Sequence, residues 1–244
     1  MSSTATAASG SSVIGRFLSS TIGLKVLMAV TGAIWIGFVL GHMVGNLQVF
    51  APVPAAAPHP LNVYAAFLQG LGGVLWLARI ALLLAFVAHV RAAMMLSALN
   101  RQARPQTYKN KKNLQASPTS YYMLVSGLVL LAFLLYHIAH LTLGVTNPEL
   151  AALPLDHGLI NVYAKVLASF RQPLIAGIYV IANVFLGLHL HHAVSSMVQT
   201  LGLRTPRYAP LVDKLGPAVG GLVIVGNLSM PLAVWLGVVG VVGA

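Results

Sequence analysis

The sequence predicts an all-α integral membrane protein whose chain crosses the bilayer five times. Of its 244 residues, 58% are hydrophobic and only 7% are charged, whereas about a quarter of the residues in a soluble domain are charged. The mean hydropathy is +0.85. The apolar residues form long segments separated by polar ones, so most of the surface is expected to contact lipid rather than water.

Five segments are long and apolar enough to form membrane-spanning helices, which need roughly 20 apolar residues each. In chain order they are residues 22–50, 68–99, 120–145, 172–200 and 215–243. The second and the fourth are long enough to project beyond the hydrocarbon. We expect residues 13–244 to form one transmembrane domain. The Ser-, Ala- and Thr-rich residues 1–12 are typical of a disordered tail.

The charged residues predict the orientation of the helices. The net charge is +11, from 14 Lys and Arg against three acidic residues. Cations gather at the start of the first segment and in the links between segments two and three and between four and five: Arg16, Lys25, Arg101, Arg104, Lys109, Lys111, Lys112, Arg204, Arg207 and Lys214. The other two links contain only Lys165 and Arg171. The positive-inside rule therefore places the N-terminus in the cytoplasm and the C-terminus outside a cell membrane.

Residue types that are missing exclude several chemistries. The chain has no cysteine, which excludes disulfides, iron–sulfur ligation and thiolate metal sites within it. The acidic residues Glu149, Asp156 and Asp213 lie outside the predicted apolar segments. A relay of acidic side chains through the membrane is therefore not expected.

An internal repeat relates the first two apolar segments to the third and fourth. Thr31-Gly32 is followed by His42, and Ser126-Gly127 is followed by His137, with the histidine ten residues after the glycine in both cases. An Asn-Val-Tyr-Ala segment then follows each of them, at 62–65 and at 161–164.

Each Asn-Val-Tyr-Ala segment is followed by a further histidine, His89 in the first half and His189 in the second. The equivalent features lie 95 to 100 residues apart and occur in the same order. Both halves would enter the membrane from the same side, so the sequence predicts a parallel repeat about an axis along the membrane normal.

Seven of the nine histidines lie in apolar segments, namely His42, His89, His137, His140, His189, His191 and His192. A single histidine there could be a neutral imidazole bonded to a neighbouring helix. Four histidines at repeated positions favour a functional interpretation instead, because polar groups in a membrane are costly.

Depth along the helices predicts how these four histidines pair. With about 1.5 Å per residue, His42 and His137 both lie about 25 Å from the cytoplasmic side, and His89 and His189 about 16 to 20 Å. Two facing imidazoles suit a six-coordinate haem iron, which carries electrons. Zinc would require more ligands at one depth. The sequence thus predicts one haem between His42 and His137, the outer pair, and one between His89 and His189, the inner pair.

Other residues are secondary candidates at this site. Gly37, Gly41 and Gly45 recur every four residues around His42, which is compatible with close approach of a flat macrocycle or with ordinary helix packing. Arg79 and Arg91 could pair with haem propionates, although Arg79 could equally extend to the interface. His140 and His192 are candidates for propionate or quinone contacts, and His191 points away from His189.

Four segments resemble a known family. They are TGAIWIGFVLGHMVGNLQVF (31–50), FVAHVRAAMMLSALNRQARPQTY (86–108), SGLVLLAFLLYHIAH (126–140) and HLHHAVSSMVQTLG (189–202). Over roughly 20–240 the chain resembles the dihaem cytochrome b subunit of succinate dehydrogenases and fumarate reductases, in its five-helix, single-chain form.

The resemblance implies a non-catalytic electron-transfer subunit. It implies a flavoprotein subunit and an iron–sulfur subunit on the cytoplasmic face, two b haems, and electron exchange with membrane quinone, usually menaquinone. It also implies the same histidine pairs, with His89 and His189 nearer the iron–sulfur subunit. Some members use a glutamate before the second helix in quinol chemistry, whereas residues 50–70 here contain no acid and offer only His59, Asn62, Tyr64 and Gln69.

Two alternatives stay open at this point. One is the cytochrome b subunit of another quinone-linked oxidoreductase, such as a formate dehydrogenase or a nitrate reductase. The other is a transporter built from parallel repeats with histidines as proton carriers. A transporter is disfavoured because acids are absent and no broken helix is expected at mid-membrane in both halves.

Overall fold

The computed structural model describes residues 13–52, 56–103 and 122–240. Within these ranges the chain is helical and has no strand; Asp156 and Leu159 form an isolated bridge. Five helices are long and apolar enough to cross a membrane: Thr21–Phe50, Gly73–Gln102, Met123–Thr142, Pro173–Thr200 and Ala209–Trp235. The all-α, five-span class is therefore confirmed. The tail predicted at residues 1–12 and the cations Arg104, Lys109, Lys111 and Lys112 of the basic link lie outside the described residues.

The first span begins at a capped helix terminus. A short helix, α1 (Val13–Ser19), precedes α2 (Thr21–Asn46), and the side chain of Ser20 between them accepts a hydrogen bond from Gly23 N at 3.0 Å. Such a cap satisfies one of the free N–H groups of the first turn. The 3₁₀ helix η1 (Leu47–Phe50) extends α2.

The second span starts later than predicted. Residues 68–70, expected in the span, belong to a separate helix, α3 (Pro60–Gly70), and the membrane helix α4 runs from Gly73 to Gln102. The break lies at Gly72, whose φ of 52° is in the left-handed region that glycine adopts without steric cost. The chain therefore turns between the two helices instead of continuing as one.

The third span ends in an unusual turn. The helix α6 (Met123–His137) continues as the π-helix η2 (Ile138–Thr142), closed by a bond from Leu143 N to Ile138 O of 2.8 Å. Single π turns inside helices are rare and frequently lie at functional sites. This one follows His137 directly and contains His140.

The last two spans follow a loop with its own short helices. The loop contains the 3₁₀ helix η3 (Pro148–Ala152) and α7 (Val162–Phe170). The helix α8 (Pro173–Thr200) matches its predicted range, whereas α9 (Ala209–Trp235) begins and ends earlier than the predicted 215–243. Helix α9 starts with Pro at its first turn, where a missing N–H costs little, and Gly237 with φ 73° follows its end.

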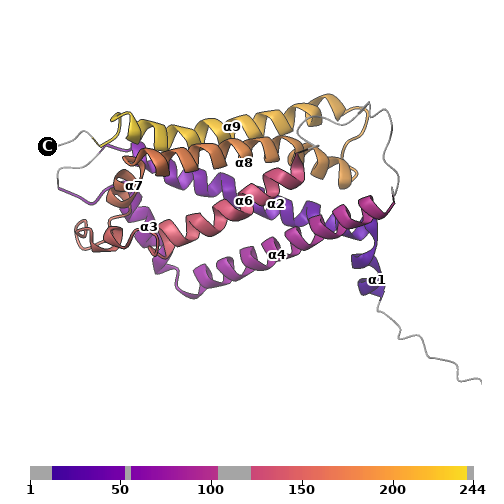
Figure 1. Cartoon of the computed structure of the whole chain (residues 1–244), viewed down its shortest axis with the longest axis horizontal. Coiled ribbons are helices and arrows are strands. Elements are labelled where there is room, and N and C mark those ends of the chain that lie inside the picture. The colour runs from indigo at the N-terminus through magenta and orange to yellow at the C-terminus, as the bar shows by residue number, and fades with distance from the viewer. Residues whose placement is uncertain (1–12, 53–55, 104–121, 241–244) are drawn as a thin grey trace, which may run out of the picture.

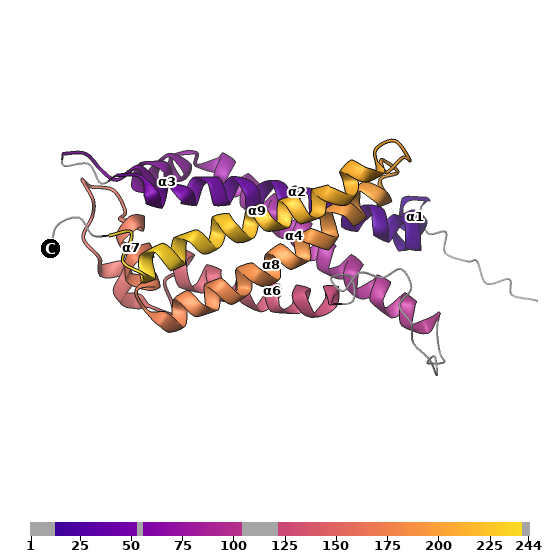
Figure 2. The same cartoon turned by 90° about the horizontal axis from the view of Figure 1, so that it is seen from above.

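The five spans lie side by side along the long axis of the molecule (Figure 1). Helices α3 and α7 lie together near the C-terminal end of the bundle, and α1 lies at the opposite end. The view from above shows α9 lying along α8, with α2 and α6 on either side of that pair (Figure 2). Helix α2 packs against α4 and α8, and α8 also packs against α6 and α9.

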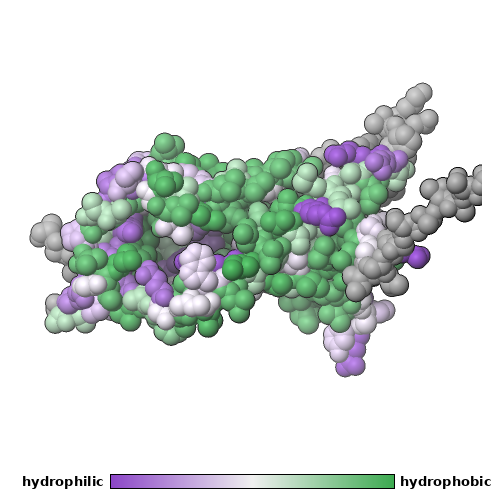
Figure 3. Space-filling view, turned by 90° about the horizontal axis from the view of Figure 1, so that it is seen from below, coloured by the Kyte–Doolittle hydropathy of each residue, from purple (hydrophilic) through white to green (hydrophobic). Residues whose placement is uncertain are grey.

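Apolar side chains cover the outside of the bundle. Leu77, Leu135 and Val225, on three different spans, are 69%, 64% and 71% exposed. Figure 3 shows hydrophobic residues along the middle of the molecule and hydrophilic ones mainly toward its two ends. An apolar band of this kind is compatible with lipid as the surrounding solvent, which fits a membrane location.

Glycines let the backbones of α8 and α9 come into direct contact. A Cβ atom on Gly220 would lie 2.5 Å from the carbonyl oxygen of Gly187, and one on Gly216 would collide with the carbonyl oxygen of His191. Small residues commonly allow close packing between membrane helices. The same region is tied by a bond of 2.8 Å from Asn227 Nδ2 to Asn183 Oδ1.

Candidate functional site

His42 and His137 face each other across the bundle. Their ring centres are 5.9 Å apart and their ring planes are inclined by 89°. His42 comes from the last turns of α2 and His137 ends the α-helical part of α6. Phe38 stacks on the His42 ring at 5.4 Å, and Phe133 lies 5.7 Å from the His137 ring.

This separation suits two imidazoles that share one metal ion. Metal–nitrogen bonds to imidazole are about 2 Å long, so the centres of two rings on opposite sides of one ion are about 6 Å apart. Perpendicular ring planes are compatible with this arrangement, because each plane need only contain the metal–nitrogen direction. The donor set at this level is therefore of the type that holds a six-coordinate haem iron.

His89 is held by a hydroxyl group from the neighbouring helix. Its Nδ1 lies 3.0 Å from Thr31 Oγ1, and that hydroxyl lies 2.7 Å from the carbonyl oxygen of Leu27. The hydroxyl has one proton, which it donates to the carbonyl, so its oxygen accepts from His89 Nδ1–H. A neutral His89 therefore has its lone pair on Nε2.

His189 has the same arrangement in the second half of the chain. Its Nδ1 lies 3.0 Å from Ser126 Oγ, and that hydroxyl donates to the carbonyl oxygen of Met123 at 3.0 Å. Gly127 lies against His189 as Gly32 lies against His89, since added Cβ atoms would be 3.8 and 3.5 Å from the two Cε1 atoms. The paired Thr-Gly and Ser-Gly positions of the sequence thus make equivalent contacts.

His89 and His189 form the inner pair predicted from the sequence. Both are half-buried and both come from the middle of long spans, α4 and α8. In neutral rings held through Nδ1, the Nε2 atoms are the ones available to a metal ion, and fixing the ring through its other nitrogen is typical of metal-binding histidines.

Tyr179 connects His137 to His140. Its hydroxyl lies 3.2 Å from His137 Nδ1 and 2.9 Å from His140 Nδ1. The other ring nitrogen of His140 lies 3.2 Å from Ser169 Oγ, on α7. His140 is only 1% exposed and Tyr179 only 5%, so these contacts are shielded from water.

The glycines of α2 differ in their surroundings. A Cβ atom on Gly45 would lie 2.5 Å from the ring of Tyr64, so Gly45 serves helix packing. A Cβ atom on Gly37 or Gly41 would meet nothing within 4 Å. These two glycines are therefore not explained by close helix contacts within the described chain.

The remaining candidates from the sequence are Arg79, Arg91, His191 and His192. Arg79 lies over the ring of Trp76 at 5.0 Å, and both Arg79 and Arg91 are exposed on α4. His192 is half-buried on α8. His191 packs its backbone against Gly216 and Gly220 of α9, away from His189. Among the residues it describes, the structure thus shows no carboxylate group that pairs with Arg79 or His192.

Asp156 supplies a carboxylate to residues 50–70, where the sequence itself has none. Its Oδ2 accepts from the backbone N of His59 and from Asn62 Nδ2, both at 2.7 Å. Hydrogen bonds from the side chain of His157, from His59 N and from Asn62 lower the pKa of Asp156 to about 2. Burial lowers the pKa of His59, which stacks on Tyr163 at 3.8 Å. At neutral pH this carboxylate is ionised.

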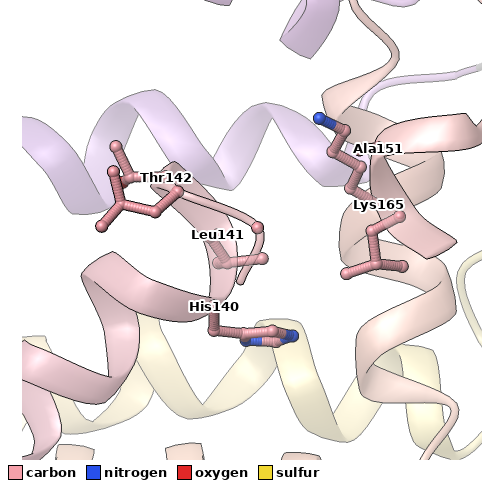
Figure 4. A pocket seen from close by; sticks show the side chains of 8 residues that line it. His140, Leu141, Thr142, Ala151 and Lys165 are labelled. Atoms are coloured by element: carbon pink, nitrogen blue, oxygen red, sulfur yellow. The ribbon is translucent and has the colours of Figure 1, made fainter. Parts of the chain in front are cut away.

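A cavity lies beside His140 (Figure 4). It has a volume of about 230 Å³ and is lined by His140, Leu141, Thr142, Leu143, Gly144, Leu150, Ala151 and Lys165. Its polar side chains are the imidazole of His140 and the hydroxyl of Thr142, both from the π turn, and the ammonium group of Lys165 from α7. No group of three or more His, Cys, Asp or Glu side chains that could hold a bare metal ion occurs among the described residues.

Comparison with known protein families, with characterised proteins and with solved structures finds no match to the chain. The site is therefore interpreted from its own residues. Tyr179, Ser169 and Asp156 were missed from the sequence as partners of the histidines. Tyrosine, serine and a loop aspartate carry no distinctive pattern, and each acts on a residue 29 to 97 positions away in the chain.

Proposed function

We propose that this chain is a dihaem cytochrome b, the membrane-anchor subunit of a succinate:quinone oxidoreductase. The observation that carries the proposal is that His89, His137 and His189 each place Nδ1 within 3.2 Å of a hydroxyl oxygen. For His89 and His189 the hydroxyl already donates to a backbone carbonyl, which leaves Nε2 for a metal. Ligand histidines in general are held this way through their second nitrogen.

Four histidines would hold the two haems. His42 and His137 form the outer pair, at the end of the bundle that carries α3 and α7. His89 and His189 form the inner pair, toward the end that carries α1. A haem held by two of these imidazoles would supply a one-electron carrier. Two such levels in one bundle would provide a route for electrons along the membrane normal.

The role of the chain itself is to position and insulate. Thr31 and Ser126 orient the inner imidazoles by accepting their Nδ1–H protons. Phe38 and Phe133 pack on the outer imidazoles and exclude water from them. The apolar outer surface keeps the whole arrangement in lipid. Succinate chemistry would take place on a partner subunit.

The proposed partners are a flavoprotein subunit and an iron–sulfur subunit at the α1 end. Arg16, Lys25, Arg101, Arg204 and Lys214 belong to helices or links at that end, and Arg204 forms an exposed ion pair of 3.1 Å with Asp213. By the positive-inside rule this end is cytoplasmic. Its excess of positive charge would attract an acidic partner over about 10 Å at moderate salt. Membrane quinone, usually menaquinone in this family, would be the other electron partner.

The visible spectrum of the purified membrane complex tests the proposal. We expect the α-band of reduced b haem and two haems per chain by pyridine haemochrome. Absence of haem would favour a transporter, and a ratio near one would contradict the two-level arrangement. Copurified subunits and succinate-dependent haem reduction distinguish this complex from a formate dehydrogenase or a nitrate reductase, which would leave the haem oxidised when succinate is added.

Charge reversal of the basic link tests the partner assignment. Replacing Lys109, Lys111 and Lys112 by Glu should loosen the iron–sulfur partner and slow haem reduction by succinate. Reduction by added quinol should persist, because that route does not cross the interface. Normal copurification of the triple variant at every salt concentration would show that these lysines serve orientation only.

A further inference from the structure

The hydrogen bonds around Tyr179 form a chain whose direction is fixed from one end. Ser169 Oγ lies 2.7 Å from the carbonyl oxygen of Lys165, and a carbonyl can only accept, so the serine proton is donated there. The serine oxygen therefore accepts from His140 Nε2–H at 3.2 Å. No proton is left on Nδ1 of a neutral His140, so that nitrogen is an acceptor.

The same reasoning continues to His137. The Tyr179 hydroxyl donates its only proton to His140 Nδ1 at 2.9 Å. Its oxygen must then accept from His137 Nδ1–H at 3.2 Å. His137 consequently carries its proton on Nδ1 and its lone pair on Nε2. His140 is neutral in this scheme because it is 1% exposed and its two ring partners are uncharged hydroxyls.

We infer that Tyr179, backed by His140, is a positioning residue that sets the electron-donating strength of the outer ligand His137. A hydroxyl whose own proton is donated onward is a better acceptor. A stronger bond to Nδ1–H makes the imidazole more basic, and a more basic ligand favours the oxidised metal. The relay thus lowers the reduction potential of the centre held by His42 and His137. This inference depends on the proposed haem function.

Among the described residues, no such relay leads from the inner pair. The Nδ1 atoms of His89 and His189 each bond to a single hydroxyl group, and that hydroxyl donates to a backbone carbonyl of the helix it belongs to. In contrast, the series of hydrogen bonds that starts at His137 continues through Tyr179 on α8 and His140 in the π turn to Ser169 on α7. The π turn and the burial of Tyr179 against Phe133 and Phe170, with ring centres 5.1 and 4.9 Å apart, hold the relay in place. The two centres would therefore be tuned by different surroundings.

Optical redox titration of the intact complex tests this role. Tyr179→Phe keeps the ring and removes the hydroxyl, so both haems should be retained. The reduction equilibrium constant of one haem should rise roughly three- to tenfold, which is about 30 to 60 mV for one electron. The same shift should appear in a His89→Ala background, which keeps the outer centre. His140→Leu should shift the same haem in the same direction by less.

Tyr136→Phe is the matched control. Tyr136 stacks on His140 at 5.4 Å and lies 6.1 Å from the Tyr179 ring, but its hydroxyl is not part of the relay. Its replacement should leave both potentials unchanged. If the Tyr179→Phe complex retains two haems but has the same reduction potentials as wild type, the relay is overturned and the proposed function is not. The same holds if both reduction potentials shift equally. A wild-type complex without b haem overturns the proposed function and the relay with it.

Discussion

Asn62 and Asn161, the first residues of the two Asn-Val-Tyr-Ala segments, are hydrogen-bonded to each other. Asn62 Nδ2 lies 3.2 Å from Asn161 Oδ1, and Asn62 Oδ1 accepts from the backbone N of Tyr163 at 2.8 Å. Asn161 in turn caps α7 by accepting from Ala164 N at 2.9 Å. The two halves of the chain are thus joined through the residues that mark the repeat.

Asn62→Ala should weaken this joint. Asn62 is 1% exposed and its side chain bonds to three other residues, so its loss leaves buried polar groups unpaired, at about 1–3 kcal/mol. We expect a lower melting temperature in detergent at a fixed scan rate. Gln69→Ala, at an exposed position of the same helix, is the control. Equal melting temperatures for the two variants would show that the joint contributes no stability.

Asp156→Asn should change how stability depends on pH. The pKa of Asp156 is lowered to about 2 in the folded chain, so its ionised form stabilises the fold. That contribution is complete above the ordinary carboxyl pKa of about 4 and is lost as the pH falls through about 2. The melting-temperature difference between wild type and Asp156→Asn should therefore be constant above about pH 5 and shrink below about pH 4. A difference that stays constant to the lowest pH would contradict this.

Thr31→Val and Ser126→Ala should weaken the inner centre alone. Each removes the oxygen that accepts from the Nδ1–H of His89 or His189. Loss of such a partner typically costs 10- to 100-fold in metal affinity. We expect reduced occupancy of one haem in each variant by pyridine haemochrome, whereas Thr31→Ser should retain both. Loss of the haem held by His42 and His137 would instead show that these hydroxyls act on the other level.

Alanine substitutions should separate the two histidine pairs. His42→Ala or His137→Ala should remove the outer haem, and His89→Ala or His189→Ala the inner one, because a single remaining imidazole cannot complete six-coordination. Electron paramagnetic resonance of the oxidised haems measures which signal disappears. His191→Ala should keep both signals, since His191 lies against α9. Loss of a haem in that variant would contradict the assignment of His189.

Gly220→Ala should destabilise the α8–α9 contact, and Gly221→Ala should not. A Cβ atom on Gly220 would lie 2.5 Å from the carbonyl oxygen of Gly187, whereas one on Gly221 would meet nothing within 4 Å. Overpacking of this kind costs about 1–3 kcal/mol, and Ala at an open helix position is about 1 kcal/mol better than Gly. Melting temperatures of the two variants should differ in opposite directions from wild type. A stable Gly220→Ala variant would mean that α9 shifts without cost.

The membrane spans could be predicted from the sequence because each one satisfies its backbone hydrogen bonds internally and needs only length and apolarity. The residues at which the spans begin and end could be predicted less accurately. The predicted start at residue 68 was wrong because Gly72 turns the chain with a positive φ, and α3 and α7 were not anticipated at all. Capping at His59 and Asn161 sets where these two helices begin, and such caps are weak signals in a sequence.

The sequence by itself determined the membrane class, and its repeated spacing singled out four histidines as candidate ligands, because apolar length and repeated spacing are local properties of the chain. Only the tertiary structure decided what each histidine touches. The approach of His42 to His137, the bond of Tyr179 to both His137 and His140, and the reach of Asp156 to His59 join residues 39 to 97 positions apart. Such contacts depend on helix packing and on the single proton of each hydroxyl, neither of which is encoded in the spacing of residues along one segment.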